Sequence, residues 1–355
     1  MAKNAYLIIS DLHDYCKNID NRVDYPGEIM KVKNKILELG LMYKEKGYNP
    51  IALLLGDVNN RSYQNVNKAI LNNNYWIAAN DLFDKIYSVL GNHEISFYNA
   101  NPFFTLVNEI DSVKLQMIQN KVWKPIGIFN IFNVVDYLED GEVMFHFNHY
   151  GCPVTIPDKE HYNIGLFHTE FLFSEVAKAS EDIYHMNAFT KNTIKAQDNE
   201  LLDLYNVTFF GHHHKIYGCW DIETDKKHHC YVYHLASLGR PNVTEVADNF
   251  LERNIPVVLV EDGRFVTIEE NKFMLPSRSE CVKEDIVALN KQSYERTKAL
   301  QIATDYTPSD DSPTKNIQTF LMVDTYLSTI FNDLIDNCTD SISDGLINSI
   351  NTEGV

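Results

Sequence analysis

The chain has 355 residues, of which 45% are hydrophobic, 12% aromatic and 23% charged. This composition predicts a globular protein with a sizeable core, and it excludes disordered, collagen-like and disulfide-knot chains. The net charge of −18 excludes simple coating of nucleic acid or anionic membranes, although bound metal ions would still let the protein act on phosphates.

Five short apolar runs each stop at polar side chains of the kinds that bind metals. Short continuous apolar runs are typical of strands buried on both faces of a sheet. Ligands of α/β sheets collect at strand ends, so these side chains are candidates for one common site. In chain order, residues 5–10 precede Asp11 and His13, 51–55 precede Asp57, 86–90 precede Asn92, His93 and Glu94, 163–167 precede His168, and 207–210 precede His212, His213 and His214.

Helices are predicted between these runs. Residues 27–46 carry apolar side chains at helical spacing, and Gly47 and Pro50 then end the pattern. A second helix is predicted at residues 195–205, just before the last run. The alternation of strand, helix and strand indicates an α/β layered core, with the active site at the C-terminal ends of the strands.

The pattern of apolar runs that end at polar side chains stops after His214. Short β runs at residues 231–235, 255–260 and 264–269 are expected to form a second sheet that closes the same domain. An Asp262-Gly263 turn separates the last two.

The end of the chain is strongly acidic. Residues 305–355 contain nine acidic residues and one basic residue, a net charge of −8, which leaves −10 for the rest. Residues 304–315 are polar and contain prolines, which predicts a linker. Apolar residues between 317 and 335 fall on one helical face, so this extension docks on the body or binds a partner. We expect a main domain at 1–275, a helical and linker segment at 276–315, and an acidic amphipathic helix at 316–355.

The polar side chains at the strand ends form a chemically coherent set. Two carboxylates, one amide and four imidazoles suit divalent Mn, Fe or Zn rather than a thiolate site. Residues two apart on an extended segment point the same way, so both members of D-x-H or H-x-H can reach one ion. One bridging carboxylate would make a dinuclear centre. The predicted ligands are Asp11, His13, Asp57, Asn92, His168, His212 and His214.

This order of motifs, D-x-H, GD, GNH, a lone His and GHxH, resembles the calcineurin-like metallophosphoesterase superfamily over residues 5–270. The resemblance implies a layered fold of two β-sheets flanked by helices and two divalent metal ions, with Mn²⁺ expected and Fe or Zn as alternatives. It implies that residues 1–275 are catalytic and that a metal-bound hydroxide attacks phosphorus. The implied roles are Asp11, His13 and His214 on one metal, Asn92, His168 and His212 on the other, Asp57 as the bridge, and His93 as a catalytic imidazole that is not a ligand.

A looser resemblance bears on the substrate. Residues 236–241, the long spacing from Asn92 to His168 and the C-terminal extension are similar to SbcD-type DNA-repair nucleases. This resemblance implies a DNA exonuclease or endonuclease, with an SMC-like ATPase or a second copy of the chain as partner. Asn60, Arg61 and Arg240 are the expected substrate contacts. The chain has no Walker motif of its own, so an ATPase function would come from another chain.

Other functions remain open on the same residues. GDVNNR at 56–61 and GNHE at 91–94 are similar to protein Ser/Thr phosphatases, so a protein or small-substrate phosphatase is an alternative. A cyclic-nucleotide phosphodiesterase is another, and a non-catalytic scaffold is a third class. His146, His149 and His161 compete with His168 as the lone ligand, and the lysines at 31, 33 and 35 are expected on a solvated helix face or against phosphate.

Cysteine usage and hydropathy predict the environment. The six cysteines are scattered with no CxxC pair, which indicates free thiols in a reducing compartment. No apolar stretch approaches the roughly 18 residues that a membrane span needs. We therefore expect a cytoplasmic protein with no membrane partner.

Overall fold

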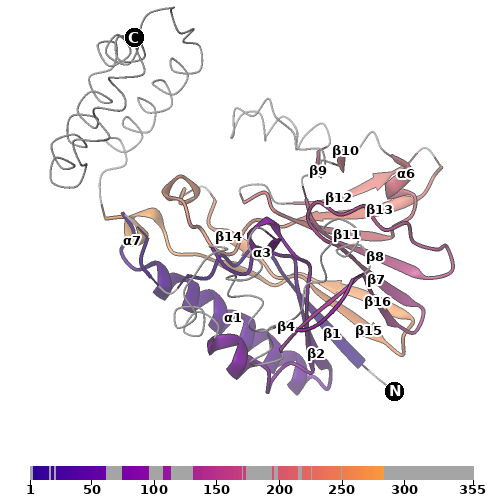
Figure 1. Ribbon diagram of the computed structural model, residues 1–355, viewed down its shortest axis with the longest axis horizontal. Helices are drawn as coiled ribbons and strands as arrows, with labels where there is room; N and C mark the ends of the chain where they lie inside the picture. The colour runs from indigo at the N-terminus through magenta and orange to yellow at the C-terminus, as the bar shows by residue number, and fades with distance from the viewer. Residues whose placement is uncertain are drawn as a thin grey trace, which may run out of the picture. The chain divides into compact units, whose positions relative to one another are not determined.

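Strand β1 (Lys3–Ile9) alternates its side chains between two apolar layers. Leu7 and Ile9 pack in the layer that contains helix α1 (Tyr25–Glu45), whereas Tyr6 lies in the layer shared with the second sheet. Successive side chains of a strand point to opposite faces, so covering both faces requires an unbroken apolar run. The first sheet is thus the central layer, with α1 and the second sheet on opposite sides of it (Figure 1).

The computed structural model describes residues 3–15, 17–19, 21–60, 74–95, 107–112, 131–169, 171–172, 194–195, 199–214, 218–224, 226–248 and 250–283. All of them belong to the first of two compact units, Met1–Lys283. The second unit, Glu284–Val355, lies outside the described residues, and with it the predicted linker at 304–315 and the predicted helix at 317–335.

The first sheet has seven strands in the order β16-β15-β1-β2-β3-β5-β4. Strands β1, β2, β3, β5 and β4 run parallel to one another. On the other side of β1, β15 pairs antiparallel with β1, and β16 pairs antiparallel with β15. Their bounds, besides β1, are β2 (Asn49–Leu54), β3 (Lys85–Ser88), β4 (Val107–Asp111), β5 (Phe132–Val135), β15 (Val257–Glu261) and β16 (Phe265–Glu269).

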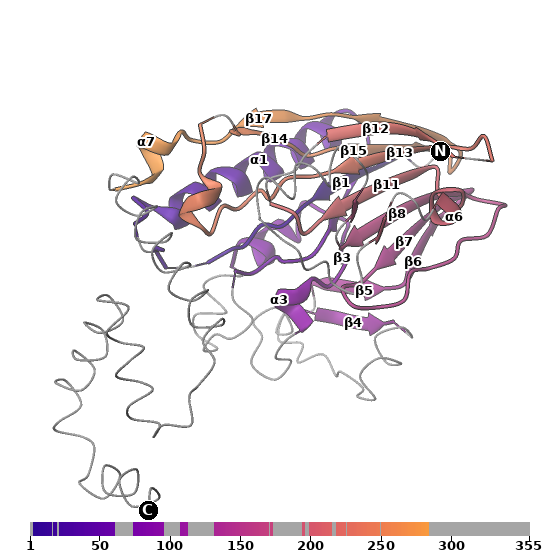
Figure 2. The same cartoon turned by 90° about the horizontal axis from the view of Figure 1, so that it is seen from above.

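The second sheet has six strands in the order β12-β13-β11-β8-β7-β6, which can be followed in Figure 2. The four inner strands are parallel and the two edge strands antiparallel. Their bounds are β6 (Tyr137–Asp140), β7 (Val143–Asn148), β8 (Tyr162–His168), β11 (Val207–Gly211), β12 (Gly218–Glu223) and β13 (His229–His234).

Short elements complete the described part of the chain. Two small strand pairs, β9 with β10 and β14 with β17, lie outside the main sheets. The bounds are β9 (Phe171–Leu172), β10 (Ile194–Lys195), β14 (Glu252–Asn254) and β17 (Lys272–Met274), with helices α3 (Asn92–Ile95), α6 (Asn199–Leu202) and α7 (Arg278–Cys281) and a 3-10 helix at Val243–Glu245.

The two main sheets pack face to face through a layer of buried apolar side chains. Leu53 and Val258 from the first sheet meet Phe145, Leu166 and Phe209 from the second, and all five are buried. Each such side chain contributes about 1.5–3 kcal/mol on leaving water. This packing fixes the two sheets against each other and so fixes the loops at their ends.

Helix α1 confirms the helix predicted at residues 27–46. It begins after Asp24, whose side chain accepts a hydrogen bond from the Gly27 backbone nitrogen at 3.0 Å, and Pro26 occupies its first turn. The five apolar residues at helical spacing in this segment are all buried: Ile29, Val32, Ile36, Leu39 and Tyr43. Among the described helices, none is both long enough and apolar enough to span a membrane.

Two sequence predictions about secondary structure are wrong in part. The described helix in residues 195–205 is only α6, Asn199–Leu202, and residues 194–195 pair with β9 instead. The late β runs do not form one sheet, because β13 joins the second sheet while β15 and β16 extend the first. Apolar periodicity identifies a strand, but pairing partners depend on long-range packing that periodicity does not encode.

Candidate metal centre

The C-terminal ends of parallel strands place the predicted ligands. Asp11 and His13 follow β1, Asp57 follows β2, and Asn92 follows β3 at the start of α3. His168 is the last residue of β8, and its neighbour β11 leads into His212 and His214. Because the two sheets are stacked, these loops meet at one place, and the structure brings all seven side chains together.

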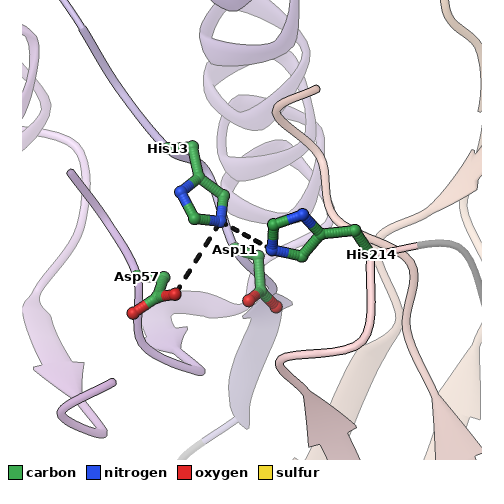
Figure 3. Close-up of side chains that lie close together, drawn as sticks. All are labelled: Asp11, His13, Asp57 and His214. Atoms are coloured by element: carbon green, nitrogen blue, oxygen red, sulfur yellow. Dashed lines mark hydrogen bonds and ion pairs between the residues drawn. The ribbon is translucent and has the colours of Figure 1, made fainter. Parts of the chain in front are cut away.

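One group consists of Asp11, His13, Asp57 and His214 (Figure 3). Each offers a ligand atom, and these atoms all lie within 4.8 Å of one another. His13 Nε2 lies 2.9 Å from His214 Nε2 and 3.8 Å from Asp57 Oδ2. The first three residues are only 1% exposed and His214 is half-buried, so most of the group lies inside the protein.

A second group consists of Asp57, His168 and His212, which also offer atoms within 4.8 Å of one another. His168 Nε2 lies 3.5 Å from Asp57 Oδ1 and 3.2 Å from His212 Nδ1. Asn92 adds its Oδ1 at 3.1 Å from the same His168 nitrogen. Asp57 belongs to both groups and directs a different oxygen into each, which is the arrangement of a bridging carboxylate.

The protonation of these groups fits divalent metal ions. Burial and the His214 imidazole keep the pKa of His13 well below its usual value, and burial with His168 lowers the pKa of His212 to about 2. Both imidazoles are therefore neutral, the form that binds metals. Although burial opposes it, the charge of His168 keeps the pKa of Asp57 well below its usual value.

The ligand nitrogens and carboxylate oxygens also lie so close to one another that the site favours the binding of cations. The Nε2 atoms of His13 and His214 are 2.9 Å apart, and one proton at most fits between them. His168 Nε2 is likewise close to the Asp57 carboxylate, whose charge and hydrogen bond raise the pKa of His168 to about 9 against the effect of burial. Two carboxylates and four imidazoles around two positions are thus consistent with a dinuclear metal site, with no preference among Mn, Fe and Zn.

Hydrogen bonds from residues outside the ligand groups orient two of the ligand imidazoles. His168 Nδ1 lies 2.7 Å from the carbonyl oxygen of Leu55, and His214 Nδ1 lies 2.9 Å from Oε1 of Glu245. A hydrogen bond at Nδ1 fixes the ring and leaves Nε2 for the metal. Burial opposes it, but the hydrogen bond to Glu245 raises the pKa of His214.

Glu94 organises the backbone of the centre. Its carboxylate accepts hydrogen bonds from the backbone nitrogens of Asp57 at 2.9 Å, Val58 at 3.0 Å and Gly91 at 3.0 Å. Burial and the Asp57 charge raise the pKa of Glu94 to about 8. The side chain therefore ties the loop after β2 to the loop after β3, which keeps Asp57 beside Asn92.

The ligand loops contain strained backbone. Asp11, His13, Asp57 and His212 have positive φ angles of 28°, 48°, 47° and 82°. Such conformations cost non-glycine residues on the order of 1–3 kcal/mol each and persist only where surrounding contacts impose them. Their concentration at four ligands marks the centre as the place where the fold stores strain.

Gly91 allows the close approach of these loops, and we expect Gly91→Ala to disrupt the centre. A Cβ there would lie 2.6 Å from the Asp57 backbone nitrogen and 2.9 Å from the His168 ring. Overpacking of this kind costs about 1–3 kcal/mol, and moving Asp57 should release bound metal. Thermal unfolding and metal analysis test this expectation.

Gly47→Ala is the matched control for this glycine. Gly47 has a φ of +85°, and a Cβ there would meet nothing within 4 Å. This variant should lose roughly 1 kcal/mol to backbone strain and keep its metals. A Gly91→Ala protein that binds two ions and melts like the wild type would contradict the steric argument.

His93 lies at the edge of the centre. Its side chain is 30% exposed, and its Nε2 lies 3.9 Å from Asp57 Oδ2. Its ring centroid is 5.0 Å from that of His13, and its backbone nitrogen donates to Asp57 Oδ1 at 3.0 Å. The imidazole is thus next to both metal groups and reachable from solvent.

The expected substrate contacts are placed differently. Asn60 is half-buried, and its backbone nitrogen donates to the Asp14 carbonyl at 3.0 Å. Arg61 lies outside the described residues. Arg240 is 2% exposed, and its guanidinium donates to Glu28 at 3.1 Å and to the Pro276 carbonyl at 3.0 Å. Because that side chain is enclosed by protein, the structure gives it a structural role, and we withdraw it as a substrate contact.

Two other sequence expectations also change. Lys33 is not on a solvated face of α1, because its ammonium is buried in an ion pair with Asp14. His149, a competitor for the lone ligand, instead accepts a hydrogen bond from the Leu90 backbone nitrogen at 3.0 Å, while its other nitrogen lies 3.1 Å from the Val135 carbonyl.

Sequence reasoning missed two residues around the ligands, Glu245 and Tyr150, and it did not reveal that Glu94 of GNHE anchors the backbone. Glu245 had a local signal, the N-x-x-E capping box that begins at Asn242. The half-buried Tyr150 had none, yet its ring centroid lies 5.5 Å from that of His212 and 6.1 Å from that of His168.

A search of curated proteins gives no match. Among solved structures, a 5′-nucleotidase precursor from Thermus thermophilus is similar, with a TM-score of 0.34 and 12% identity over 83% of this chain and 59% of that one. The NAD nucleotidase of Haemophilus influenzae gives a TM-score of 0.35 and 14% identity over 90% and 60%.

The chain thus spans about three fifths of the length of these two proteins, and at these TM-scores the likeness carries no argument about function. The family comparison is stronger, because the model of the calcineurin-like phosphoesterases matches residues 5–216. That match covers more than half of the chain and every one of the seven clustered side chains. The protein therefore belongs to the calcineurin-like phosphoesterase family.

Proposed function

We propose that this phosphoesterase hydrolyses phosphodiesters and that DNA is its substrate class, cleaved as an exonuclease or endonuclease. The observation that carries phosphoester hydrolysis is the pair of buried ligand groups that share Asp57. Two adjacent cation positions suit a reaction at phosphorus, where charge develops on both the attacking and the leaving oxygen.

Seven side chains would hold the metals. Divalent ions in such a site polarise phosphoryl oxygens and lower the pKa of water. Asp11, His13 and His214 would hold the first ion, Asn92, His168 and His212 would hold the second, and Asp57 would contribute to both. We propose Mn²⁺ as the resident ion, with Fe and Zn as alternatives.

His93 is proposed to move the proton. Its half-buried imidazole is outside both ligand groups and within 3.9 Å of the Asp57 carboxylate. From this edge it can donate a proton to the leaving oxygen or a hydrogen bond to the phosphoryl group. The ligand imidazoles cannot take this role while their nitrogens bind metal, so we assign the role of the acid to His93.

Support for DNA comes from the sequence, through the similarity of residues 236–241 and of the Asn92 to His168 spacing to SbcD-type nucleases. The second candidate is a phosphatase or cyclic-nucleotide phosphodiesterase on the same centre, favoured by the GDVNNR and GNHE sequences. These functions differ in the group attached to phosphorus, which the metal ligands do not select.

A substrate panel with Mn²⁺ separates the candidates. The panel comprises bis-p-nitrophenyl phosphate, single-stranded and double-stranded DNA, a cyclic nucleotide, a phosphopeptide and p-nitrophenyl phosphate. We expect hydrolysis of the diester and of DNA, and end-labelled against internally labelled DNA distinguishes exonuclease from endonuclease action. Preference for the phosphopeptide or the monoester would replace the nuclease proposal with the phosphatase.

A partner is proposed for the acidic end of the chain, either an SMC-like ATPase or a second copy. Deleting residues 305–355 should leave metal binding and small-diester hydrolysis unchanged, because none of the seven proposed ligands lies beyond His214. Association with the partner should disappear, since the predicted apolar helical face is removed. Sedimentation velocity and thermal unfolding test this expectation. A large fall in melting temperature without any lost association would contradict the docking proposal.

A further inference from the structure

We propose that residues 236–245, called the clamp segment below, position the Asp11, His13 and His214 half of the metal centre. Within this segment, Glu245 is the residue that sets the affinity of that half for its ion. The inference rests on the metal centre of the proposed function and is independent of the substrate. It gives a role to the segment that contains Arg240, the residue expected from the sequence to contact substrate.

The clamp segment joins the ends of two strands through backbone contacts. Ser237 Oγ donates to the Asp11 carbonyl at 2.9 Å, and the Gly239 backbone nitrogen donates to the same oxygen at 3.0 Å. The Ser237 backbone nitrogen donates to the His214 carbonyl at 3.3 Å. One short segment therefore fixes both the loop after β1, in the first sheet, and the loop after β11, in the second.

The clamp segment approaches the loop after β1 so closely that position 239 has room only for glycine. A Cβ on Gly239 would collide with the backbone carbonyl of Leu12 and lie 3.0 Å from the Tyr25 hydroxyl. That hydroxyl in turn donates to the His13 carbonyl at 2.9 Å. Asp11, Leu12 and His13 are thus each contacted at the backbone, which accounts for how positive φ angles persist at two of them.

Glu245 adds a direct contact with a ligand ring. Its Oε1 lies 2.9 Å from His214 Nδ1 and also accepts from Asn242 Nδ2 at 2.7 Å. Its Oε2 accepts from the Asn242 backbone nitrogen at 3.3 Å, and the residue is only 7% exposed. The carboxylate is therefore immobilised on both oxygens. It holds His214 with Nε2 toward His13, and a carboxylate at Nδ1 also makes an imidazole a stronger ligand.

Buried cations attach the clamp segment to the rest of the fold. Arg240 donates to Glu28 on α1 at 3.1 Å, and Arg22 donates to the Arg240 carbonyl. Arg253 Nε donates to the Ser237 carbonyl at 2.6 Å. These contacts make the segment a rigid support, and they explain why an arginine expected to bind phosphate is enclosed instead.

The other half of the centre is oriented by different groups. His168 is aimed by the Leu55 carbonyl at 2.7 Å, and Glu94 holds the loops that carry Asp57 and Asn92. Changing Glu245 should therefore weaken one ion selectively. A role in folding alone would weaken both ions or neither.

Titration of the full-length protein with Mn²⁺ tests this inference. Binding is followed by calorimetry and by the electron paramagnetic resonance of free Mn²⁺. Wild type should bind two ions. Glu245→Ala should weaken one of them by roughly 10–100-fold, as expected for loss of such an outer carboxylate, and leave the other unchanged. Glu245→Gln should lose less, because its amide oxygen still accepts from Nδ1 without the charge.

Glu252→Ala is the matched control. Glu252 is a nearby glutamate on β14 whose side chain is 39% exposed and pairs with Lys272 at 3.8 Å, so both ions should bind as in wild type. The inference would be overturned if Glu245→Ala bound both ions with wild-type affinity. It would also be overturned if Glu245→Gln bound both ions equally more weakly and its metal-free form melted at a lower temperature than wild type. Wild type that binds two ions but hydrolyses no ester would overturn the proposed function and leave this inference intact.

Discussion

The Asp57→Ala variant is expected to bind neither metal ion and to show no hydrolysis of any phosphoester. Asp57 is the one residue present in both ligand groups, and it is 1% exposed. Removing it takes one oxygen from each position and removes one of the two carboxylates whose negative charge offsets two divalent cations. Metal analysis after dialysis, together with the substrate panel, measures both losses.

Folding of this variant needs its own check. Asp57 Oδ1 accepts from the His93 backbone nitrogen at 3.0 Å, so alanine leaves a partly buried donor without its acceptor, at a cost of up to about 1–3 kcal/mol. Asp57→Asn keeps an oxygen in that place and should fold better while still losing metal, because a neutral amide oxygen bridges cations poorly.

Asp84→Ala removes an exposed carboxylate from the segment just before β3 and should bind two ions. Two ions retained by Asp57→Ala would refute the assignment of the bridge.

The His93→Ala variant is expected to keep both metal ions and to lose roughly 10²–10⁴-fold in rate, the usual contribution of a positioned acid or base. The reason is positional, because the imidazole lies outside both ligand groups yet 3.9 Å from Asp57 Oδ2. Metal analysis and the rate of diester hydrolysis are measured on the same preparation. Loss of metal from this variant would show that His93 is a ligand, and the assignment of the seven ligands would then be wrong.

The leaving group makes this second test sharper. If His93 protonates the leaving oxygen, then the loss should be larger for DNA, which releases a basic alkoxide, than for a p-nitrophenyl diester, which releases a stable phenolate. Equal losses would assign His93 to the phosphoryl oxygens instead. His161→Ala removes another histidine, paired with Asp158 at 2.8 Å and outside both ligand groups, and should change neither rate.

Local patterns in the sequence determined much of the framework. The apolar run before Asp11 required a strand covered on both faces, and β1 does alternate between two cores. The helical spacing of residues 27–46 produced α1 with the predicted inner face. The polar residues at the ends of these runs formed one site, because parallel strands present their C-terminal ends at the same edge. These features depend on neighbours a few residues apart, which is why a single sequence reveals them.

Tertiary structure alone decided strand partnership and the outer contacts of the site. β15 and β16 joined the first sheet because the free side of β1 was available there, a fact about strands more than 240 residues apart in the chain. Lys33 and Arg240 were expected at solvent or substrate, but Lys33 pairs with the buried Asp14 and Arg240 with the partly buried Glu28, and both cations lie inside the fold.

The contact between His214 and Glu245 shows the physical reason most directly. The sequence determined that both residues were present and that His214 followed a strand. Which imidazole nitrogen would face the metal depended on a carboxylate 31 residues further along, brought to 2.9 Å by a segment that packs against both sheets' loops. Hydrogen bonds of about 3 Å select the ring orientation, and their partners lie close together only in the folded structure, where the two sheets are stacked.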